Sequence, residues 1–324
     1  SPKQFSFLIA EQDDWGTHAV NETSPNNNLI ALDVDSIGSP SLNVNQGLEH
    51  RSGSRILQAT DFFQDIKGSV KEFTEGLDLL LSNITGDASV PYAVASNAGT
   101  STLTSASTNL TDQQLLSIVY KSAYGTNADL AFKDCFCTAL SFNGDANTEG
   151  GRVKFSATFK TGSLAEDLTD ATTTIDTAIT ANNYYMSAWD ANDRIIAGHS
   201  DVILSSFSLN ITNDVEFVGL TSTGFESATR AGEISATADF TCVYDANTAP
   251  MFENFNDQVT GASEGSTLMG ADATPSDGAF EFKFASSVLT DVSFSDAGLM
   301  MLNASVKAVG AGIGSSTALF EVSC

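Results

Sequence analysis

The segment EISATADFTCVY, residues 233–244, decides the fold class. Its apolar side chains fall on every second residue from Ile234 to Tyr244, and polar side chains fill the places between them. A period of two is typical of a β-strand with one dry face and one wet face, as in antiparallel sheets. The same alternation over 152–160 and 206–212 predicts further strands. The sequence therefore predicts a mainly β protein.

Short blocks from the first half of the chain return in the same order in the second half. The pairs are 41–44 (SLNV) with 208–211 (SLNI), 66–73 with 233–244, 77–86 with 252–261, 138–142 with 290–294, and 157–160 with 304–307. Collinear blocks with the same apolar spacing predict an internal duplication with loops of different lengths. The alternative is that amphipathic strands rich in Ser and Thr simply look alike.

Short helices are predicted at the same place in each half. Apolar residues are spaced by three and four in 77–86 and again in 252–261. Pro250 suits a first helical turn, with Asn247 or Thr248 as its cap. Each half therefore reads as two strands, a short helix, a loop and two more strands. A further helix is predicted over 111–122 from the spacing of its apolar residues.

The length of 324 residues suggests about two domains at roughly 150 residues each. We expect an N-terminal arm and first strand region over 1–40, a first domain over 41–165, a connector over 166–204 and a second domain over 205–324.

The chain is strongly acidic. It has 14 Lys and Arg against 40 Asp and Glu, for a net charge of −26. Such a chain repels duplex DNA and anionic lipid, which excludes sequence-reading DNA-binding modules and polybasic membrane anchors. A saline habitat is another origin of this acidity. The apolar stretch near the N-terminus is short and no apolar run approaches about 18 residues, so we expect neither a signal peptide nor a transmembrane segment.

No catalytic, metal or cofactor site is expected. His18, His50 and His199 have no second ligand at zinc spacing, and no nucleophile elbow, phosphate loop or dinucleotide motif occurs. The segment DANTEG at 145–150 resembles the start of a calcium loop, but Ser156 stands where the final acid belongs, so an acidic hairpin turn is the better reading. The four cysteines are too few for a disulfide scaffold, and we expect free thiols.

The order of these patterns resembles the tail tube proteins, or major tail proteins, of long-tailed bacteriophages. The stretches that carry the resemblance are GLEHRSGSR (47–55), DIKGSVKEFTEGLDLLLSNITG (65–86), SSFSLNITND (205–214), AGEISATADFTCVYDANTAPMFENF (231–255) and GAFEFKFASSVLTDVSFSDAGLMMLNASVKAV (278–309). No single motif is diagnostic, and the order of patterns over most of the chain carries the identification.

The resemblance implies two tandem β-sandwich-like tube domains, each with a short flanking helix, whose inner strands form a shared barrel in an assembled ring. Two domains per chain imply three chains per ring with pseudo-sixfold symmetry. The alternative is six chains, with one half of each facing outward. Rings would stack into a virion tail in the host cytoplasm, bind a tape-measure protein and a tail terminator, and let DNA pass without specific binding. No enzyme activity, cofactor or membrane is implied.

Physical reasoning predicts a negatively charged lumen wall that lets the genome pass during ejection without holding it, because every phosphate contact adds an electrostatic anchor. The candidate lumen residues are Glu233, Ser235, Thr237, Asp239, Ser69 and Glu72. The candidate inter-subunit residues are Arg51, Arg55, Lys67 and Lys71. The alternative is that these strand faces form the tube exterior.

Two other classes stay open. A secreted or cell-surface acidic β-sandwich binding module would share the composition and the duplication, and would bind glycan or calcium. A β-sandwich enzyme is the third class, although no set of acid, base and nucleophile stands out. A neighbouring tape-measure gene favours the tube, and an export signal favours the surface module.

Overall fold

The structure is a computed structural model of the chain. It describes residues 5–12, 14–18, 29–32, 34–37, 41–43, 46–48, 55–57, 61–69, 80, 83–84, 100–104, 115–122, 130–162, 166–167, 175–176, 184–189, 194–220, 225–230, 234–256, 264–270, 280–296, 299–309 and 318–323.

The fold is mainly β, as the sequence predicts, and nearly all strand pairs are antiparallel. The strands of the first half are β1 (Phe5–Gln12), β2 (Leu29–Ala31), β3 (Val34–Ile37), β4 (Ser41–Asn43), β5 (Gln46–Leu48), β6 (Arg55–Leu57), β7 (Asp61–Ser69), β8 (Thr100–Thr104), β9 (Leu115–Ser122), β10 (Leu130–Asp145), β11 (Lys154–Thr161), β12 (Glu166–Asp167) and β13 (Ile175–Asp176). The elements that follow are a 3-10 helix, η3 (Met186–Ala188), then β14 (Arg194–Ile195), β15 (Leu204–Thr212), β16 (Val215–Leu220), β17 (Phe225–Arg230), β18 (Ser235–Val243), α2 (Ala249–Asn256), β19 (Glu264–Met269), β20 (Glu281–Asp296), β21 (Met300–Ala308) and β22 (Ala318–Ser323).

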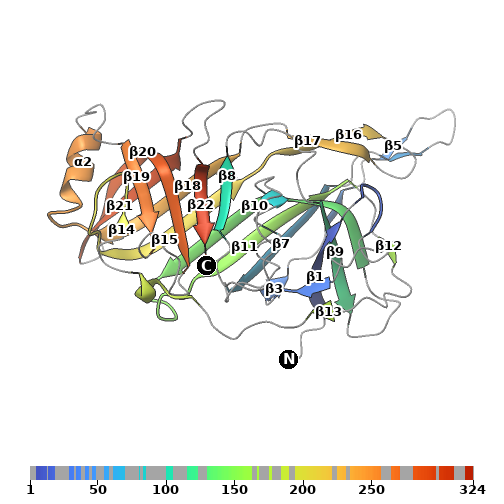
Figure 1. Ribbon diagram of the computed structural model, residues 1–324, viewed down its shortest axis with the longest axis horizontal. Helices are drawn as coiled ribbons and strands as arrows, with labels where there is room; N and C mark the ends of the chain where they lie inside the picture. Colours follow the sequence, from blue (N-terminus) through green and yellow to red (C-terminus); the bar gives the residue numbers. More distant parts are fainter. Residues whose placement is uncertain are drawn as a thin grey trace.

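The same order of strand pairing occurs twice. In the first repeat, β3 and β4 pair with β7, followed in order by β11, β10, β9 and β1. In the second repeat, β15 pairs with β18, followed by β21, β20, β19 and β14. A small strand also pairs with the start of each long strand, β12 with β10 and β22 with β20. The second repeat lies on the left of Figure 1 and the first on the right.

The registers of the two repeats agree residue by residue. Leu140 of β10 lies opposite Ala157 of β11, and Val292 of β20 lies opposite Ala304 of β21. These are the partners that the matching blocks 138–142 with 290–294 and 157–160 with 304–307 predict. Since a slip of one residue turns a whole strand over, this agreement is specific.

A β-bulge also recurs at one place in both repeats. The β10–β11 ladder shifts register at Thr138, and the β20–β21 ladder shifts at Thr290. The Thr138 hydroxyl donates to the Thr158 carbonyl at 3.3 Å, and the Thr290 hydroxyl donates to the Ser305 carbonyl at 3.2 Å. A bulge bends its strand and increases the local twist, so both long strands turn at the same point.

One block pairing needs a correction. Because β7 and β18 are equivalent nine-residue strands, Leu42 opposite Phe62 of β7 corresponds to Ile211 opposite Ala236 of β18. The sequence comparison aligned Leu42 with Leu209 instead. The error is two residues, which keeps the same face of the strand and so leaves the apolar pattern unchanged.

The two repeats join edge to edge into one sheet. The first part of β10, Leu130–Cys135, pairs with β9, and on the same edge Ala139–Asp145 pairs with β15. The strand that opens the second repeat therefore continues the sheet of the first. Strands β11, β10 and β15 cross the middle of the molecule in Figure 1.

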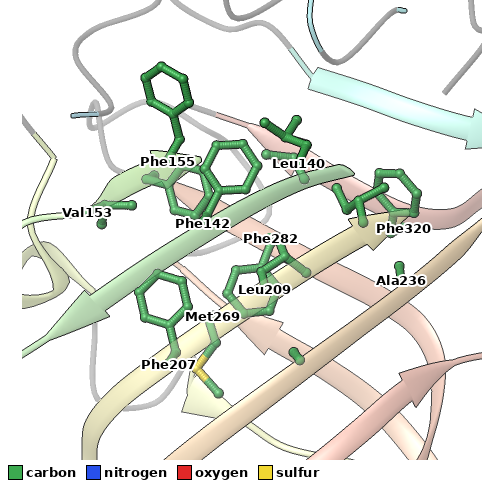
Figure 2. Close-up of a cluster of buried hydrophobic side chains, with 14 of the residues drawn as sticks. Leu140, Phe142, Val153, Phe155, Phe207, Leu209, Ala236, Met269, Phe282 and Phe320 are labelled. Carbon is green, nitrogen blue, oxygen red and sulfur yellow. The ribbon is translucent and has the colours of Figure 1, made fainter. Parts of the chain in front are cut away.

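A cluster of buried aromatic and aliphatic side chains fills this joint (Figure 2). The rings of Phe142 and Phe280 lie 4.9 Å apart, and those of Phe207 and Trp189 lie 5.0 Å apart. The indole N–H of Trp189 donates to the Phe280 carbonyl. At Gly144, an added Cβ would lie 2.7 Å from the Phe207 ring, so the packing of this ring over β10 favours glycine there.

The second-half helix is confirmed at α2, where Pro250 lies in the first turn and Thr248 directly precedes it. The Thr248 carbonyl accepts the Met251 N–H at 3.1 Å, and the Asp245 carboxylate accepts the N–H groups of Asn247 and Thr248. The first-half helix is described only at Leu80, Asn83 and Ile84, which are helical and fully buried.

Asn83 ties that helical segment to the bend in β10. Its Nδ2 donates to the Cys135 carbonyl at 3.2 Å, and its Oδ1 accepts the Cys137 N–H at 2.6 Å. Asn83→Ala leaves two buried backbone groups unpaired and is expected to lower the free energy of unfolding by about 2–4 kcal/mol. Urea unfolding measures the change. Asn143→Ala, at an exposed asparagine on β10, is the matched control and should change stability by less than about 0.5 kcal/mol; equal losses in both variants would contradict the role of Asn83.

The predicted helix over 111–122 is wrong, because residues 115–122 form β9. All eight residues of β9 pair with β1, and Leu116, Ile118 and Tyr120 are buried. This apolar run satisfies helical spacing and strand alternation at once. The ladders offered by β1 and β10 on either side decide in favour of the strand.

Candidate functional site

One face of the joined sheet is polar across both repeats, and we call it the polar sheet face. Its residues share a face because each lies directly opposite its neighbours in the strand registers. They are Ser141, Asn143 and Asp145 on β10; Lys154, Ser156, Thr158 and Lys160 on β11; Ser206, Ser208, Asn210 and Thr212 on β15; Ser235, Thr237, Asp239 and Thr241 on β18; Asp291 and Ser293 on β20; and Asn303, Ser305 and Lys307 on β21. All are half-buried or exposed, whereas their strand neighbours on the other face form the core.

Several polar groups of this face bond to one another. The Ser305 hydroxyl donates to the Asp239 carboxylate at 2.6 Å, and the Thr241 hydroxyl donates to Asn303 Oδ1 at 3.0 Å. These are cross-strand pairs between β18 and β21, which stabilise a sheet and fix its register. The surface they make is rich in hydroxyl groups.

Among the residues of the polar sheet face named above, the charges balance. The aspartates are Asp145, Asp239 and Asp291, and the lysines are Lys154, Lys160 and Lys307. From the composition we expected a negatively charged wall. The face is instead mostly uncharged hydroxyl and amide.

Three candidate lumen residues, Ser235, Thr237 and Asp239, lie together on the polar sheet face. In the register of β7 with β11, Lys67 lies opposite Ser156 and Ser69 opposite Lys154. The structure therefore brings these two positions into the same sheet. Whether the face lines a lumen stays a prediction.

For the other candidate lumen and inter-subunit residues, the structure describes only the position of Arg55. Arg55 begins β6 and lies opposite Leu48 in the β5–β6 hairpin. Four candidates lie outside the described residues: Arg51, Lys71, Glu72 and Glu233.

The calcium-like segment forms the turn between β10 and β11, as the hairpin reading predicts. The Asp145 carboxylate accepts the Asn147 N–H at 2.8 Å, and Glu149 pairs with Lys154 at 2.9 Å. The hydrogen bond from Lys154 and its charge lower the pKa of the Glu149 carboxyl. The acids are thus engaged within the turn. No group of three or more His, Cys, Asp and Glu residues suited to a metal ion occurs in the described segments.

The described cysteines are buried free thiols. Burial raises the pKa of Cys137 and of Cys242 to about 12, and it also raises the pKa of Cys135. Because the thiolate is the reactive form, none of the three is suited to nucleophilic catalysis.

This burial predicts an alkaline loss of stability. An unfolded thiol ionises near pH 8.5, whereas Cys137 and Cys242 stay neutral in the fold until about pH 12. The unfolded state therefore releases protons first, and the free energy of unfolding should fall as pH rises from about 8.5 towards 12. Urea unfolding at pH 7 and pH 10 measures the fall. Cys242→Ala should show a smaller fall than the unaltered protein, and an identical fall would contradict the contribution of this thiol.

Sequence reasoning missed the end of β20. Phe294 and Met300, which flank the β20–β21 turn, are 39% and 51% exposed. Only the duplication could have singled them out, because their counterparts in the first repeat, Phe142 and Val153, are both buried.

A scan against models of known protein families finds no match for this chain, and a search of curated proteins also finds none. No helix in the part of the chain that the structure describes has the length and apolar character to cross a bilayer.

Proposed function

We propose that this chain is a structural protein that assembles into rings of three, and that these rings stack into the tail tube of a long-tailed bacteriophage. The observation that carries the proposal is the repeated strand order with an edge-to-edge joint between the repeats. A chain that already contains one such joint is suited to form more of them with its own copies. Three chains with two repeats each give six equivalent units around a ring.

In this proposal the two repeats are tandem β-sandwich-like tube domains, and the polar sheet face lines the passage for DNA. Two features of this face support the assignment. It runs without interruption across the joint, and its hydroxyl and amide groups give the phosphate backbone few cationic anchors. The net charge of −26 adds long-range repulsion of DNA. The tape-measure protein would occupy the passage during assembly, and a tail terminator would end the stack.

Electron microscopy of the purified protein at high concentration tests the proposal. Hollow tubes with a regular axial repeat and three chains per ring are the expected result. Six chains per ring would overturn the assignment of both repeats to the ring. Chains that stay monomeric and bind calcium or glycan would favour a surface binding module.

A binding assay tests the passage separately. Assembled tubes mixed with duplex DNA at low salt should leave the DNA free in solution, because the described lining presents balanced charge. Lys160 and Lys307 are equivalent positions of the polar sheet face. If tubes retain DNA, and a Lys160→Gln, Lys307→Gln variant releases it, the proposed wall holds DNA and the conduit role is wrong.

A further inference from the structure

One edge of β20, which we call its outer edge, is paired along only part of its length, whereas the equivalent edge of β10 is paired by two strands in succession. On one edge, β10 pairs first with β9 and then, along Ala139–Asp145, with β15. On the matching edge, β20 pairs with β19 along Phe282–Val288. Beyond that point, Asp291–Asp296 has no partner on this edge among the described strands.

A complementary edge is open at the far end of the sheet. In the second repeat, β15 pairs with β18 on one side and with β10 on the other. Its counterparts in the first repeat, β3 and β4, pair with β7, and no other described strand pairs with them. Among the described strands, the sheet therefore has two open edges, and each matches one half of the β10–β15 joint.

Side-chain burial points to the same missing neighbour. Phe142 and Val153 are fully buried at the joint between the repeats (Figure 2). Their counterparts Phe294 and Met300 are exposed at the open end of the second repeat. Large apolar side chains beside an unpaired strand edge are a surface that a partner covers.

We propose that the outer edge of β20 pairs with the outer edge of β3 and β4 of a second copy, in the register that β10 and β15 adopt within the chain. The occupant is a copy of this chain because both halves of the joint occur in it. Such an interface is heterologous, since the two surfaces differ, and it generates a ring if the rotation closes.

The register follows from the repeats. Within the chain, Ser141 lies opposite Asn210. The counterpart of Ser141 is Ser293, because each lies two residues beyond the end of the β-bulge, at Ala139 in β10 and Asp291 in β20.

The counterpart of Asn210 is Ser41. Each lies opposite the third residue of an equivalent nine-residue strand, which is Thr237 in β18 and Phe63 in β7. The joint therefore places Ser293 opposite Ser41 of the second copy. Directly opposed Cα atoms lie about 4.5–5.5 Å apart, within the range that a disulfide spans.

This inference rests on the self-assembly part of the proposed function and names its partner, but it does not depend on the passage of DNA. Cysteine cross-linking of the assembled protein tests it. The variant carries Ser41→Cys, Ser293→Cys and Cys324→Ser, and its products are separated on non-reducing gels after mild oxidation. The expected result is a covalent ladder that ends at three chains.

Two matched variants set the scale. Ser141→Cys with Asn210→Cys, in the same Cys324→Ser background, should close a disulfide within one chain at the equivalent site. Asn43→Cys with Ser293→Cys moves one cysteine two residues along the same strand, to a diagonal distance of about 7–8 Å, and should cross-link at least tenfold more slowly.

The outcomes separate the inference from the proposed function. If the internal pair closes and assembled chains bearing Ser41→Cys and Ser293→Cys do not cross-link, the joint is wrong even where hollow tubes are seen. Faster linkage through Asn43→Cys overturns the register, and a ladder that ends at two overturns a head-to-tail joint. Cross-linked rings that neither stack nor form hollow tubes support the joint and overturn the tail tube.

Discussion

Phe142→Ala is expected to lower the free energy of unfolding of the monomer by about 3–5 kcal/mol. Its side chain is fully buried in the joint between the repeats, 4.9 Å from the Phe280 ring, so truncation removes the packing that joins β10 to the second repeat. Urea unfolding followed by circular dichroism measures the loss.

The matched control for Phe142→Ala is the same change at the equivalent residue, Phe294→Ala. Phe294 is 39% exposed, and the rings of Phe252 and Tyr244 pack against it. We expect its truncation to cost the monomer well under half of the loss at Phe142. Equal losses at the two positions would show that the two ends of the repeats are packed alike, against the structure.

Phe294→Asp is expected to abolish ring formation while leaving the monomer folded. In the proposed joint this side chain takes the buried place that Phe142 has within the chain, and a carboxylate there would be stripped of water without a partner. The loss of assembly should be complete at concentrations where the unaltered chain forms rings. Sedimentation velocity measures the assembly, and the circular dichroism spectrum shows whether the monomer is folded.

Leu130→Asp is the control for that experiment. Leu130 is 40% exposed, close to the exposure of Phe294, but it lies at the start of β10 and away from the open edge of β20. Rings should form with Leu130→Asp. Rings that persist with Phe294→Asp would contradict the place of this residue in the joint, and loss of rings in both variants would mean that any added charge prevents assembly.

The strands of this fold were predictable where one face meets the core and the other meets water. The alternation in 233–244, 152–160 and 206–212 predicted β18, β11 and β15 because each of these strands is buried on one side only. The prediction of a helix that included 115–122 was wrong because the apolar residues of this segment fit both the helical period and the strand period. Only the pairing of this segment with β1, which is distant in sequence, and with β10 decides between them.

The candidate site was predictable in part. Period two placed Ser235, Thr237 and Asp239 on one polar face, and the structure agrees. The balance of charge on that face was not predictable, because net charge describes the whole chain and gives no distribution over its surfaces. The joint between the repeats was not predictable either, because nothing in the sequences of β10 and β15 indicates that Ser141 pairs with Asn210.

The β10–β15 joint has a consequence for the kinetics of assembly in the proposed ring. Half of the six joints would form inside single chains, where the connector holds the two edges at a high effective concentration whatever the protein concentration outside. Only three joints would then depend on diffusional encounter, so the concentration threshold for closing a ring falls. Fusing two units into one chain also fixes their ratio and their alternation, and this frees each unit to vary its own outward loops without disturbing the order around the ring.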